Sequence, residues 1–482
     1  MLSSINLRRL FAGAALIGLT ACQTVGPNFQ TPPPPAGAAA SGYAMAGDPA
    51  AAGVRLDPEA RTAGPWWQAF GSPELDTVIR TALADSPTLA AANATLQRAQ
   101  AEAAAARGVQ QVQADANASA QRERVNTQSF GFTGFPSPTI NLYSVGATVS
   151  YDLDLFGGRR RASEAAAARA EAAARQADAA YLTLSSNLAL QAMRIAGQRA
   201  QIQAMQAVLA DDQRVIDMVR RAQAAGGEAP AASTGALAQL AEDQAQLPAL
   251  NRQLAEARHQ MALLSGKSPA EWTAPDFDLA RIALPAQVPV SLPSTLVRRR
   301  PDILESEAEL HAATAQIGVA VANQYPDIRL TANLTQGAIH PQDLFNYSAS
   351  GWNLLSGVSA PITHGGALKA QRQAAEAEAR AALARYQQTV LRAFVQVADV
   401  LSALATDQQS IAALTNSVSA AEANVRDTES AYRLGGGTLL QVVDAQRQLS
   451  RARRALLQAQ AQRYGDTVQL YAATAADWRA AG

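Results

Sequence analysis

Hydrophobic and polar residues alternate one by one in four short stretches of the chain, and this pattern predicts β-strands. Three stretches alternate clearly, at 141–155, 328–335 and 352–362, whereas 114–121 alternates only alanine with polar residues. Taken alone, the alternation favours a sheet with one face in solvent, although strands that face a membrane show the same pattern. The sequence therefore predicts four strands in two pairs.

Two very long helices follow the strand pairs. The chain runs without proline from Gly158 to Gly226 and from Gly366 to Gly435. At 1.5 Å per residue, either helix would be roughly 100 Å long. Apolar residues recur every seven positions in both helices, which is typical of coiled-coil seams. The first seam consists of Tyr181, Leu188, Ile195, Ile202, Leu209 and Ile216, and the second of Leu383, Val390, Val397, Leu404, Ile411, Val418, Val425 and Tyr432.

The two halves of the chain form an internal duplication. A shift of 209 residues places the first seam on the second, and the same shift carries Gly226 to Gly435. Stretches 86–106 and 300–320 are both helices that begin with proline and precede a strand pair. A return helix follows each long helix after a glycine-containing turn. Each repeat is therefore predicted to run helix, strand, exposed loop, strand, long helix, turn and helix.

The first 22 residues have the pattern of a bacterial lipoprotein signal. Arg8 and Arg9 precede an apolar stretch at 10–19, which is too short to span a bilayer. The cleavage box LTAC ends at Cys22, the only cysteine in the chain, so Cys22 is predicted to carry a lipid. An ordinary secretory signal with a chance cysteine is the alternative. The resemblance to lipoproteins, with Gln23 and not aspartate after the cysteine, implies sorting to the outer membrane.

The predicted chain is α+β and has five parts. They are a signal peptide (1–21), a lipidated tether with the segment after it (22–80), the first repeat (81–266), a proline-rich linker (267–299) and the second repeat (300–478). Known membrane barrels need about eight strands or more, so four strands cannot close and their edges must pair with other copies.

A pair of glycines stands where each strand pair passes into a long helix. These pairs are Gly157-Gly158 and Gly365-Gly366. Glycine lets the backbone bend sharply without a steric penalty. We therefore predict a strand-to-helix bend at each pair.

Composition excludes several classes of function. Lysine plus arginine equals aspartate plus glutamate, at 40 each, and no basic patch with interleaved aromatic residues occurs, so nucleic acid is not a predicted partner. The four histidines are isolated and no glycine-rich phosphate loop occurs, so no enzyme activity, cofactor or metal site is predicted. Asp152 and Asp154 would lie on the polar side of a strand, where a pore lining explains them. No apolar run after the signal approaches the length of a membrane-spanning helix, so any crossing would use strands.

Several motifs in order along the chain resemble one known family. They are VGPNF soon after Cys22, then PWWQAFGSPEL, YDLDLFGGRR, RRRPDI, APITHGG and AYRLGGGTLLQVVDAQRQL. In these motifs the chain resembles the TolC-like outer-membrane factors of tripartite efflux systems, in the lipoprotein branch related to NodT and OprM. The resemblance implies a homotrimer whose strands form one outer-membrane β-barrel, continued through the periplasm by a coiled-coil barrel of helices with an equatorial domain around it. It also implies three partners: a periplasmic adaptor (membrane fusion protein), an inner-membrane pump of the resistance-nodulation-division type, and outer-membrane lipid.

The resemblance also supplies a candidate channel gate. In the family, the residues that match LQVVDAQR line the closed periplasmic end, which implies rings of Leu440 and Asp444 and a role for Arg447 in holding the closed state. Leu440 and Asp444 are four residues apart and share a helix face. On spacing alone, Asp444 would be a solvated carboxylate paired with Arg447. A ring of carboxylates would favour cations and raise its own pKa.

The two helix–turn–helix tips are the candidate contacts for the adaptor. Their exposed backbone and small side chains would let a partner helix approach closely, whereas an ordinary glycine-capped turn explains the same residues. The family usually carries one glycine where this chain carries three. The first tip consists of Ala224, Ala225, Gly226 and Gly227, and the second of Leu434, Gly435, Gly436, Gly437 and Thr438.

The predicted function is a passive exit duct for small molecules, driven by an inner-membrane pump through an adaptor. The same channel could instead serve a type I protein secretion system, because the fold does not fix the cargo. A lipid-anchored periplasmic coiled-coil scaffold is a third hypothesis, and the alternation at 143–155 argues against it. The sequence does not encode the exported substrate in a readable way.

Overall fold

The computed structural model describes residues 24–33, 42–50, 54–56, 64–131, 134, 136–227 and 229–475. The signal peptide, Cys22 and much of the tether therefore lie outside the described residues. The chain divides into two compact units, each assembled from separate parts of the sequence. Unit 1 comprises Met1–Pro32, Thr95–Ala173 and Glu305–Tyr386, and unit 2 comprises Pro33–Ala94, Ala174–Leu304 and Gln387–Gly482.

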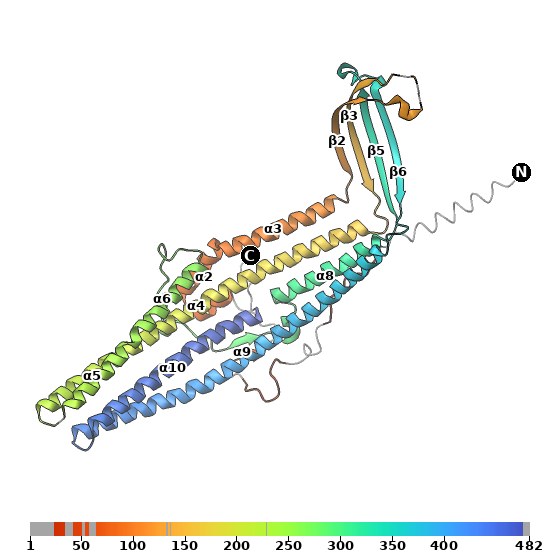
Figure 1. Ribbon diagram of the computed structural model, residues 1–482. Helices are drawn as coiled ribbons and strands as arrows, with labels where there is room; N and C mark the ends of the chain where they lie inside the picture. The colour runs from red at the N-terminus through yellow and green to blue at the C-terminus, as the bar shows by residue number, and fades with distance from the viewer. Residues whose placement is uncertain are drawn as a thin grey trace. The chain divides into compact units, whose positions relative to one another are not determined.

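Unit 1 contains a four-stranded antiparallel sheet in the order β2-β3-β5-β6 (Figure 1). Its strands are β2 (Gln113–Arg124), β3 (Thr139–Asp152), β5 (Asp327–Ala338) and β6 (Ser350–Ser359). The four predicted strands are confirmed. The two halves of the chain meet at β3 and β5, where Thr148 Oγ1 donates to Asn333 Oδ1 at 2.8 Å. Among the described strands, β2 and β6 each pair on one side only, so both edges of the sheet stay open.

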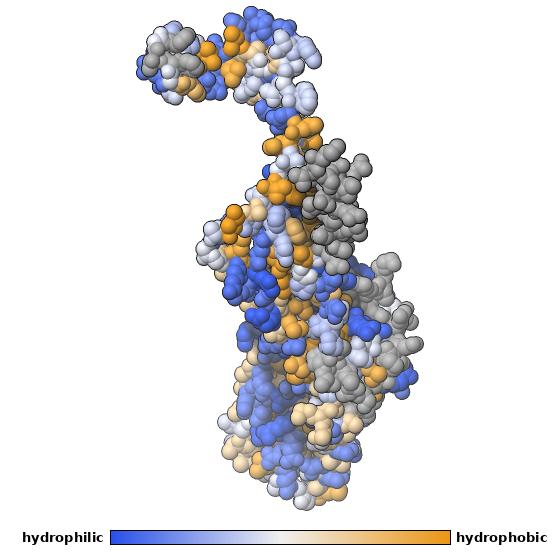
Figure 2. Space-filling view, turned by 90° about the vertical axis from the view of Figure 1, so that its right-hand side faces the viewer, coloured by the Kyte–Doolittle hydropathy of each residue, from blue (hydrophilic) through white to orange (hydrophobic). Residues whose placement is uncertain are grey.

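Part of this sheet carries large apolar side chains that no other part of the described chain covers. On β6, Trp352, Leu354 and Val358 lie on one face and are 76%, 75% and 67% exposed. Figure 2 shows hydrophobic residues in orange among hydrophilic ones over the sheet. An exposed apolar surface of this kind fits contact with lipid or with another protein.

Two helices of equal length lead into the sheet. The helix α3 (Pro87–Gly108) precedes β2 and the helix α8 (Pro301–Ala322) precedes β5, and each has 22 residues. In the described parts of the loops between paired strands there are three short 3-10 turns, η3 (Thr127–Phe130), η5 (Pro341–Asp343) and η6 (Tyr347–Ala349). The helix-then-strand order of both repeats is as predicted.

The two long helices are equal in length and equally placed in their repeats. The helix α4 (Gly158–Ala224) and the helix α9 (Ala367–Arg433) each have 67 residues, and both their starts and their ends are 209 residues apart. Seam residues such as Leu188 and Val390 are completely buried. The predicted internal duplication therefore holds for the long helices, with the same shift of 209 residues at both of their ends.

The return helices of the two repeats differ. The second repeat has one helix, α10 (Leu439–Thr474), whereas the first has α5 (Pro230–Gln244) and α6 (Gln246–Leu264), interrupted at Ala245. Pro248 explains the break, because it has no N–H to donate to the carbonyl of Gln244 and its ring crowds that carbonyl. The prediction of a single return helix in the first repeat was wrong.

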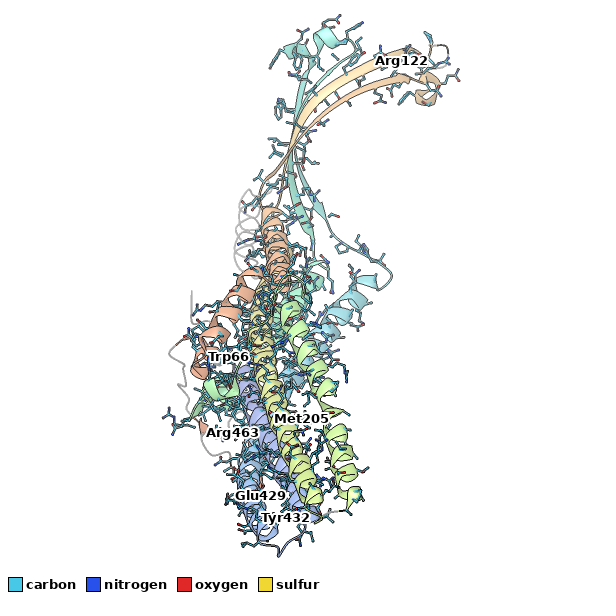
Figure 3. The ribbon with its side chains drawn as sticks, turned by 90° about the vertical axis from the view of Figure 1, so that its left-hand side faces the viewer. Trp66, Arg122, Met205, Glu429, Tyr432 and Arg463 are labelled. Carbon is cyan, nitrogen blue, oxygen red and sulfur yellow. The ribbon has the colours of Figure 1, made fainter. Side chains whose placement is uncertain are left out.

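The core of unit 2 includes an aromatic cluster from both ends of the chain. It involves η2 (Trp66–Phe70), which is followed by α2 (Pro73–Asp85), and Tyr471 of α10. The rings of Trp66, which is labelled in Figure 3, and Tyr471 stack with centroids 5.6 Å apart, and Phe70 packs edge-on to Tyr471. This burial of large rings ties the PWW motif to the last helix.

The proline-rich linker forms a small sheet that the sequence did not predict. The strand β4 (Val288–Val290) pairs in parallel with β1 (Val54–Leu56). Two short turns flank β4, η4 (Leu279–Arg281) and α7 (Pro293–Leu296). Strands of three residues carry too little alternation for a pattern to reveal them.

One described helix, α9, contains a window of 18 residues with a mean hydropathy of 1.4, in the range of membrane-spanning helices, and a third of that window is buried within the chain. The expectation that no apolar run after the signal approaches the length of a membrane-spanning helix was therefore wrong, because α9 reaches both that length and that hydropathy. Seam residues and alanines together raise the mean, since a coiled-coil helix is apolar along the stripe that it buries.

Candidate functional site

The predicted bends lie between strand and helix in both repeats. Gly157 follows β3 with a φ of +74°, and Gly365 and Gly366 precede α9 with φ of +56° and +84°. These left-handed conformations are accessible to glycine at little cost. Gly158 is the first residue of α4, and a Cβ there would lie 2.9 Å from the Cβ of Ala322. The glycines thus provide both the turn and a close approach of α8 to α4.

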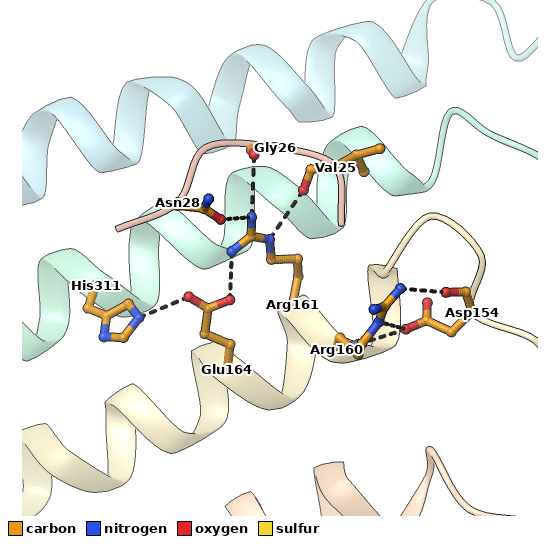
Figure 4. A network of polar contacts seen from close by, with 8 residues as sticks. All are labelled: Val25, Gly26, Asn28, Asp154, Arg160, Arg161, Glu164 and His311. Atoms are coloured by element: carbon orange, nitrogen blue, oxygen red, sulfur yellow. Dashed lines mark hydrogen bonds and ion pairs between the residues drawn. The ribbon is translucent and has the colours of Figure 1, made fainter. Parts of the chain in front are cut away.

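Asp154 caps the first long helix and does not lie on a strand. Its Oδ1 accepts from the backbone N–H of Arg159 at 2.9 Å, and its Oδ2 accepts from that of Arg160 at 3.0 Å. Figure 4 shows Asp154 beside Arg160. The strand β3 ends at Asp152, which pairs with Arg329 directly opposite on β5 at 2.7 Å. The prediction that both carboxylates point to the polar side of one strand was therefore wrong for Asp154.

Both tips end their long helix with the same hydrogen bonds. At the first tip, Gly226 N–H donates to Gln223 O and Gly227 N–H donates to Ala222 O, each at 2.9 Å. At the second tip, Gly435 and Gly436 donate to Tyr432 and Ala431 in the same way. Gly226 and Gly435 have φ of +78° and +79°, so each tip is a Schellman cap with glycine in the left-handed conformation.

The three glycines of the second tip have different roles. Gly435 supplies the left-handed residue and Gly436 the second capping bond, whereas a Cβ on Gly437 would lie 3.1 Å from the backbone nitrogen of Tyr432. Thr438 then caps α10 (Leu439–Thr474) with a capping box, in which the Thr438 backbone N–H donates to Gln441 Oε1 at 2.8 Å. The extra glycines therefore make a tight turn and not a longer loop.

The two helical hairpins pack together close to their tips. Val215, Val219 and Leu439 are buried in one cluster, and Tyr432, which is labelled in Figure 3, packs against it. Beside this cluster lies a cavity of about 700 Å³, lined mostly by small and apolar residues that include Leu440 and also by Arg447. The end of unit 2 is thus open enough at its tips to leave an unfilled apolar space.

The candidate gate residues lie on one exposed side of α10. Leu440 is 66% exposed, and the side chains of Asp444 and Arg447 are 54% and 38% exposed. Arg447 Nη1 lies 3.6 Å from Asp444 Oδ1. Within one chain, Asp444 is therefore a partly solvated carboxylate near Arg447. The described part of the chain therefore leaves most of the Leu440 side chain exposed.

A pair of aspartates faces Arg447 from the first hairpin. Asp243 is buried and accepts from Gln239 and Gln246 at 2.7 and 2.9 Å. Burial and the charge of Asp243 raise the pKa of Asp212 to about 6, and Arg447 opposes that shift. These groups line a polar cavity of about 430 Å³ between the hairpins. The positive charge of Arg447 thus lies near Asp212 on α4 and near Asp444 on α10.

A second pair of aspartates joins α9 to α10. Burial and hydrogen bonding to Asp466 raise the pKa of Asp407 to about 7. Asp466 is buried, and Gln462 Nε2 donates to both of its oxygens at 3.1 and 3.2 Å. The pair holds a proton near neutral pH because two adjacent buried carboxylates cannot both ionise easily.

The sequence analysis missed both aspartate pairs, although a signal was present. Asp212 and Asp407 each stand three residues after a seam residue, Leu209 and Leu404. That is the spacing of the second apolar position in a heptad, where a carboxylate is unexpected. In the described part of the chain, no group of three or more His, Cys, Asp or Glu side chains is placed to hold a metal ion.

Comparison with known families finds one match over most of the chain. The outer membrane efflux protein family matches residues 78–267 and 292–476. The two matched stretches correspond to the two repeats.

Similar curated proteins are efflux components of other bacteria. The pyoverdine export outer membrane protein OpmQ of Pseudomonas aeruginosa is 30% identical over 471 residues, which cover 96% of each chain. The cation efflux system protein CusC of Escherichia coli strain K12 is 28% identical over 70% of this chain and 73% of its own. The solvent efflux pump outer membrane protein SrpC of Pseudomonas putida is 30% identical over 70% of this chain and 71% of its own.

Solved structures with the same fold are outer-membrane channels. The outer-membrane channel OprN matches with a TM-score of 0.85 and 27% identity, over 95% of this chain and all of its own. The open state of the MtrE outer membrane channel of Neisseria gonorrhoeae matches with a TM-score of 0.79 and 25% identity, over 94% of this chain and 98% of its own.

Proposed function

Because this chain belongs to the outer membrane efflux protein family and is an outer-membrane efflux channel, we propose that it works as the trimeric, lipid-anchored exit duct of a tripartite pump. The observation that carries the proposal is the match to OprN over nearly the whole of both chains. The match includes the sheet and both long helical hairpins, which are the parts that a duct requires.

The trimer is supported by the two open edges of the sheet. All neighbouring strands are antiparallel, so β2 and β6 run in opposite directions and the β6 edge of one copy can pair with the β2 edge of the next. An even number of antiparallel strands is what bacterial outer-membrane barrels use. Three copies would give a barrel above the minimum of about eight strands.

The proposed partners are a periplasmic adaptor and an inner-membrane pump of the resistance-nodulation-division type. The adaptor would approach the two tips, where glycine and alanine leave the backbone accessible. The names of the relatives refer to pyoverdine, cations and solvents, which share little chemistry. We therefore propose that the pump selects the substrate and that this channel passes small molecules of several classes.

The proposed gate is a constriction formed by Leu440 and Asp444 from three copies. Its support is the exposure of both side chains on one helix face in the single chain. Arg447 would hold the closed state through Asp212 and Asp444, because it faces both carboxylates. Opening would then separate α10 from the first hairpin at the polar cavity.

The test replaces Leu440 and Asp444 together by alanine. Alanine keeps the helix intact and removes both the apolar plug and the ring of charge. Single-channel conductance in planar bilayers should rise several-fold, and cells that carry the variant should admit large antibiotics that the wild-type channel excludes.

A matched control replaces Leu263 and Glu256 by alanine. These residues are an exposed leucine and an exposed glutamate that are seven positions apart on α6, the second return helix of the first repeat. The control should conduct like the wild type. If the Leu440 and Asp444 variant assembles normally and also conducts like the wild type, the constriction lies elsewhere on the return helices.

A further inference from the structure

The segment from Thr24 to Thr31 is bound at both of its ends to other parts of unit 1. The Val25 N–H donates to Phe156 O at 3.0 Å. Thr31 Oγ1 donates to Glu307 Oε1 at 2.8 Å. A segment that begins two residues after Cys22 is therefore held in place by the chain and is not a free tether.

Arg161 makes the central contact with this segment (Figure 4). It lies in the first turn of α4, and its side chain is only 4% exposed. Its guanidinium donates to Val25 O at 3.2 Å, Gly26 O at 3.3 Å and Asn28 Oδ1 at 2.6 Å. A buried guanidinium with three acceptors on one peptide strand is a binding site for that strand.

Glu164 and His311 complete the site. Glu164 Oε2 accepts from Arg161 Nη1 at 2.7 Å, and Glu164 Oε1 lies 3.0 Å from His311 Nε2. Burial raises the pKa of Glu164, and the bonds from His311 and Arg161 outweigh burial and lower it. The His311 ring stacks on Phe29, with centroids 4.4 Å apart and planes at 14°. The network thus begins and ends on the bound segment.

Glycines allow the segment to lie directly on the backbone beneath it. Gly26 has a φ of +87°, and a Cβ there would lie 2.5 Å from the Cα of Gly318 on α8. A Cβ on Gly157 would lie 2.5 Å from Cγ2 of Thr24. Thr24 therefore rests on the bend between β3 and α4.

This geometry limits where Cys22 can be. Only two residues of chain, which span at most about 7 Å when fully extended, link the lipidation position at Cys22 to Thr24 of the bound segment. On a free tether, the residue could reach far from the sheet.

We propose that Arg161, Glu164 and His311 form a binding site for the chain's own Thr24–Thr31 segment, and that this site fixes the lipid of Cys22 at the strand-to-helix bend. The acyl chains then enter the bilayer at the base of the sheet, where the barrel meets the periplasmic leaflet. The second part rests on the proposed lipidation of Cys22.

The experiment measures chymotrypsin cleavage after Phe29 in the purified full-length channel in detergent. Chymotrypsin cuts after aromatic residues, and the stack on His311 with the Arg161 bonds should protect this site. In Arg161→Gln, cleavage should be at least about tenfold faster, because charge-assisted bonds to the segment are lost. Mass spectrometry identifies the released peptide, and cleavage after Tyr43, which bonds to Ser291 at 2.7 Å, is the internal reference.

Arg160→Gln is the matched control. The described contacts of Arg160 are with Asp154 and not with the segment, so its cleavage should equal that of the wild type. His311→Ala is a milder variant that removes the stack and one bond to Glu164. It should also speed cleavage after Phe29 if Arg161→Gln fails to fold. The proposal would be overturned if Arg161→Gln and His311→Ala were cleaved after Phe29 at the same rate as the wild type.

Lipidation is measured separately with a fatty-acid probe. Cys22→Ser should lose the label and keep the protection of Phe29, because the site is built from the chain alone. An unlabelled wild-type chain with a protected Phe29 would refute the lipid and leave the binding site. Loss of protection in Cys22→Ser with no effect of Arg161→Gln would show that lipid, and not the site, holds the segment.

Discussion

At the scale of single residues, two carboxylates interrupt the apolar packing of the long helices. Asp212 and Asp407 stand at heptad positions that usually carry apolar residues, and each is placed against a second aspartate. Two such carboxylates destabilise the folded chain when both are ionised, since like charges repel in a poorly hydrated site. Their position in the helix seams fits a contact that must be able to loosen.

Asp407→Asn should stabilise the channel at alkaline pH. The pKa of Asp407 rises from 3.8 to about 7 on folding, so the unfolded chain releases this proton first as the pH rises. The raised pKa of Asp407 therefore costs no stability below about pH 4, and the folded chain loses stability progressively as the pH rises from about 4 to 7. At pH 8 the variant should gain about 1 kcal/mol per copy, less than the whole shift implies because solvent screens the group. At pH 4 it should gain little.

Thermal unfolding midpoints at pH 4 and pH 8 check this prediction. Asp427→Asn, an exposed aspartate on the same helix, is the control and should behave like the wild type at both values. An equal gain for Asp407→Asn at the two pH values would contradict the shared proton.

At the scale of elements, each junction between strand and helix is made by local chemistry. The first junction combines the left-handed Gly157 with the Asp154 cap, whereas the residue equivalent to Asp154 in the second repeat is Thr363. The first junction also carries the binding site for the N-terminal segment. Because Phe29 also stacks on His311, the segment holds this junction against α8 of the second repeat.

Asp154→Ala should loosen the first turn of α4. It removes two bonds to backbone N–H groups and also places alanine at a φ of +21°, so we expect a loss of about 1–2 kcal/mol. Hydrogen exchange of the amides of residues 159 and 160 should speed up. Asp154→Asn keeps a side-chain acceptor and tolerates the backbone conformation, so it is the matched control. Unchanged exchange in Asp154→Ala would mean that packing alone holds the turn.

The elements that the sequence predicted well are those with strong local signals. Periodic apolar residues and terminal glycines predict α4 and α9, because a Schellman cap needs a residue such as Gly226 or Gly435. Proline at 248 also carried a local signal for the broken return helix, and it was overlooked. The β1–β4 pairing and the site around Arg161 could not be predicted, since each joins residues more than 100 positions apart without a repeating pattern.

At the scale of the whole molecule, the single chain is incomplete. Its sheet leaves β2 and β6 with free edges and exposes Trp352 and Leu354. Free strand edges inside a bilayer would be costly, because lipid offers no hydrogen bonds. The open edges of the sheet therefore support the proposed assembly of several copies into one barrel, as does the family to which the chain belongs.

The detergent-solubilised protein should run as a trimer. Amides of β2 and β6 should be protected from hydrogen exchange in the trimer and lose protection together on dissociation, because each edge is satisfied by another copy. Native mass spectrometry gives the stoichiometry, and exchange of the central β3 and β5 amides serves as the reference. A stable monomer that inserts into membranes with β-rich spectra would refute the closed barrel.

The two repeats differ in length in only one region. The starts of α3 and α8, and of β2 and β5, are 214 residues apart, whereas the starts of α4 and α9 are 209 apart. The first repeat therefore has five more residues between the start of its first strand and the start of its long helix. The long helices show no such difference, and seven extra residues in one of them would move its tip by about 10 Å relative to the other. Their equal lengths therefore keep the two tips level, and the difference between the repeats is confined to the stretch from the first strand to the long helix.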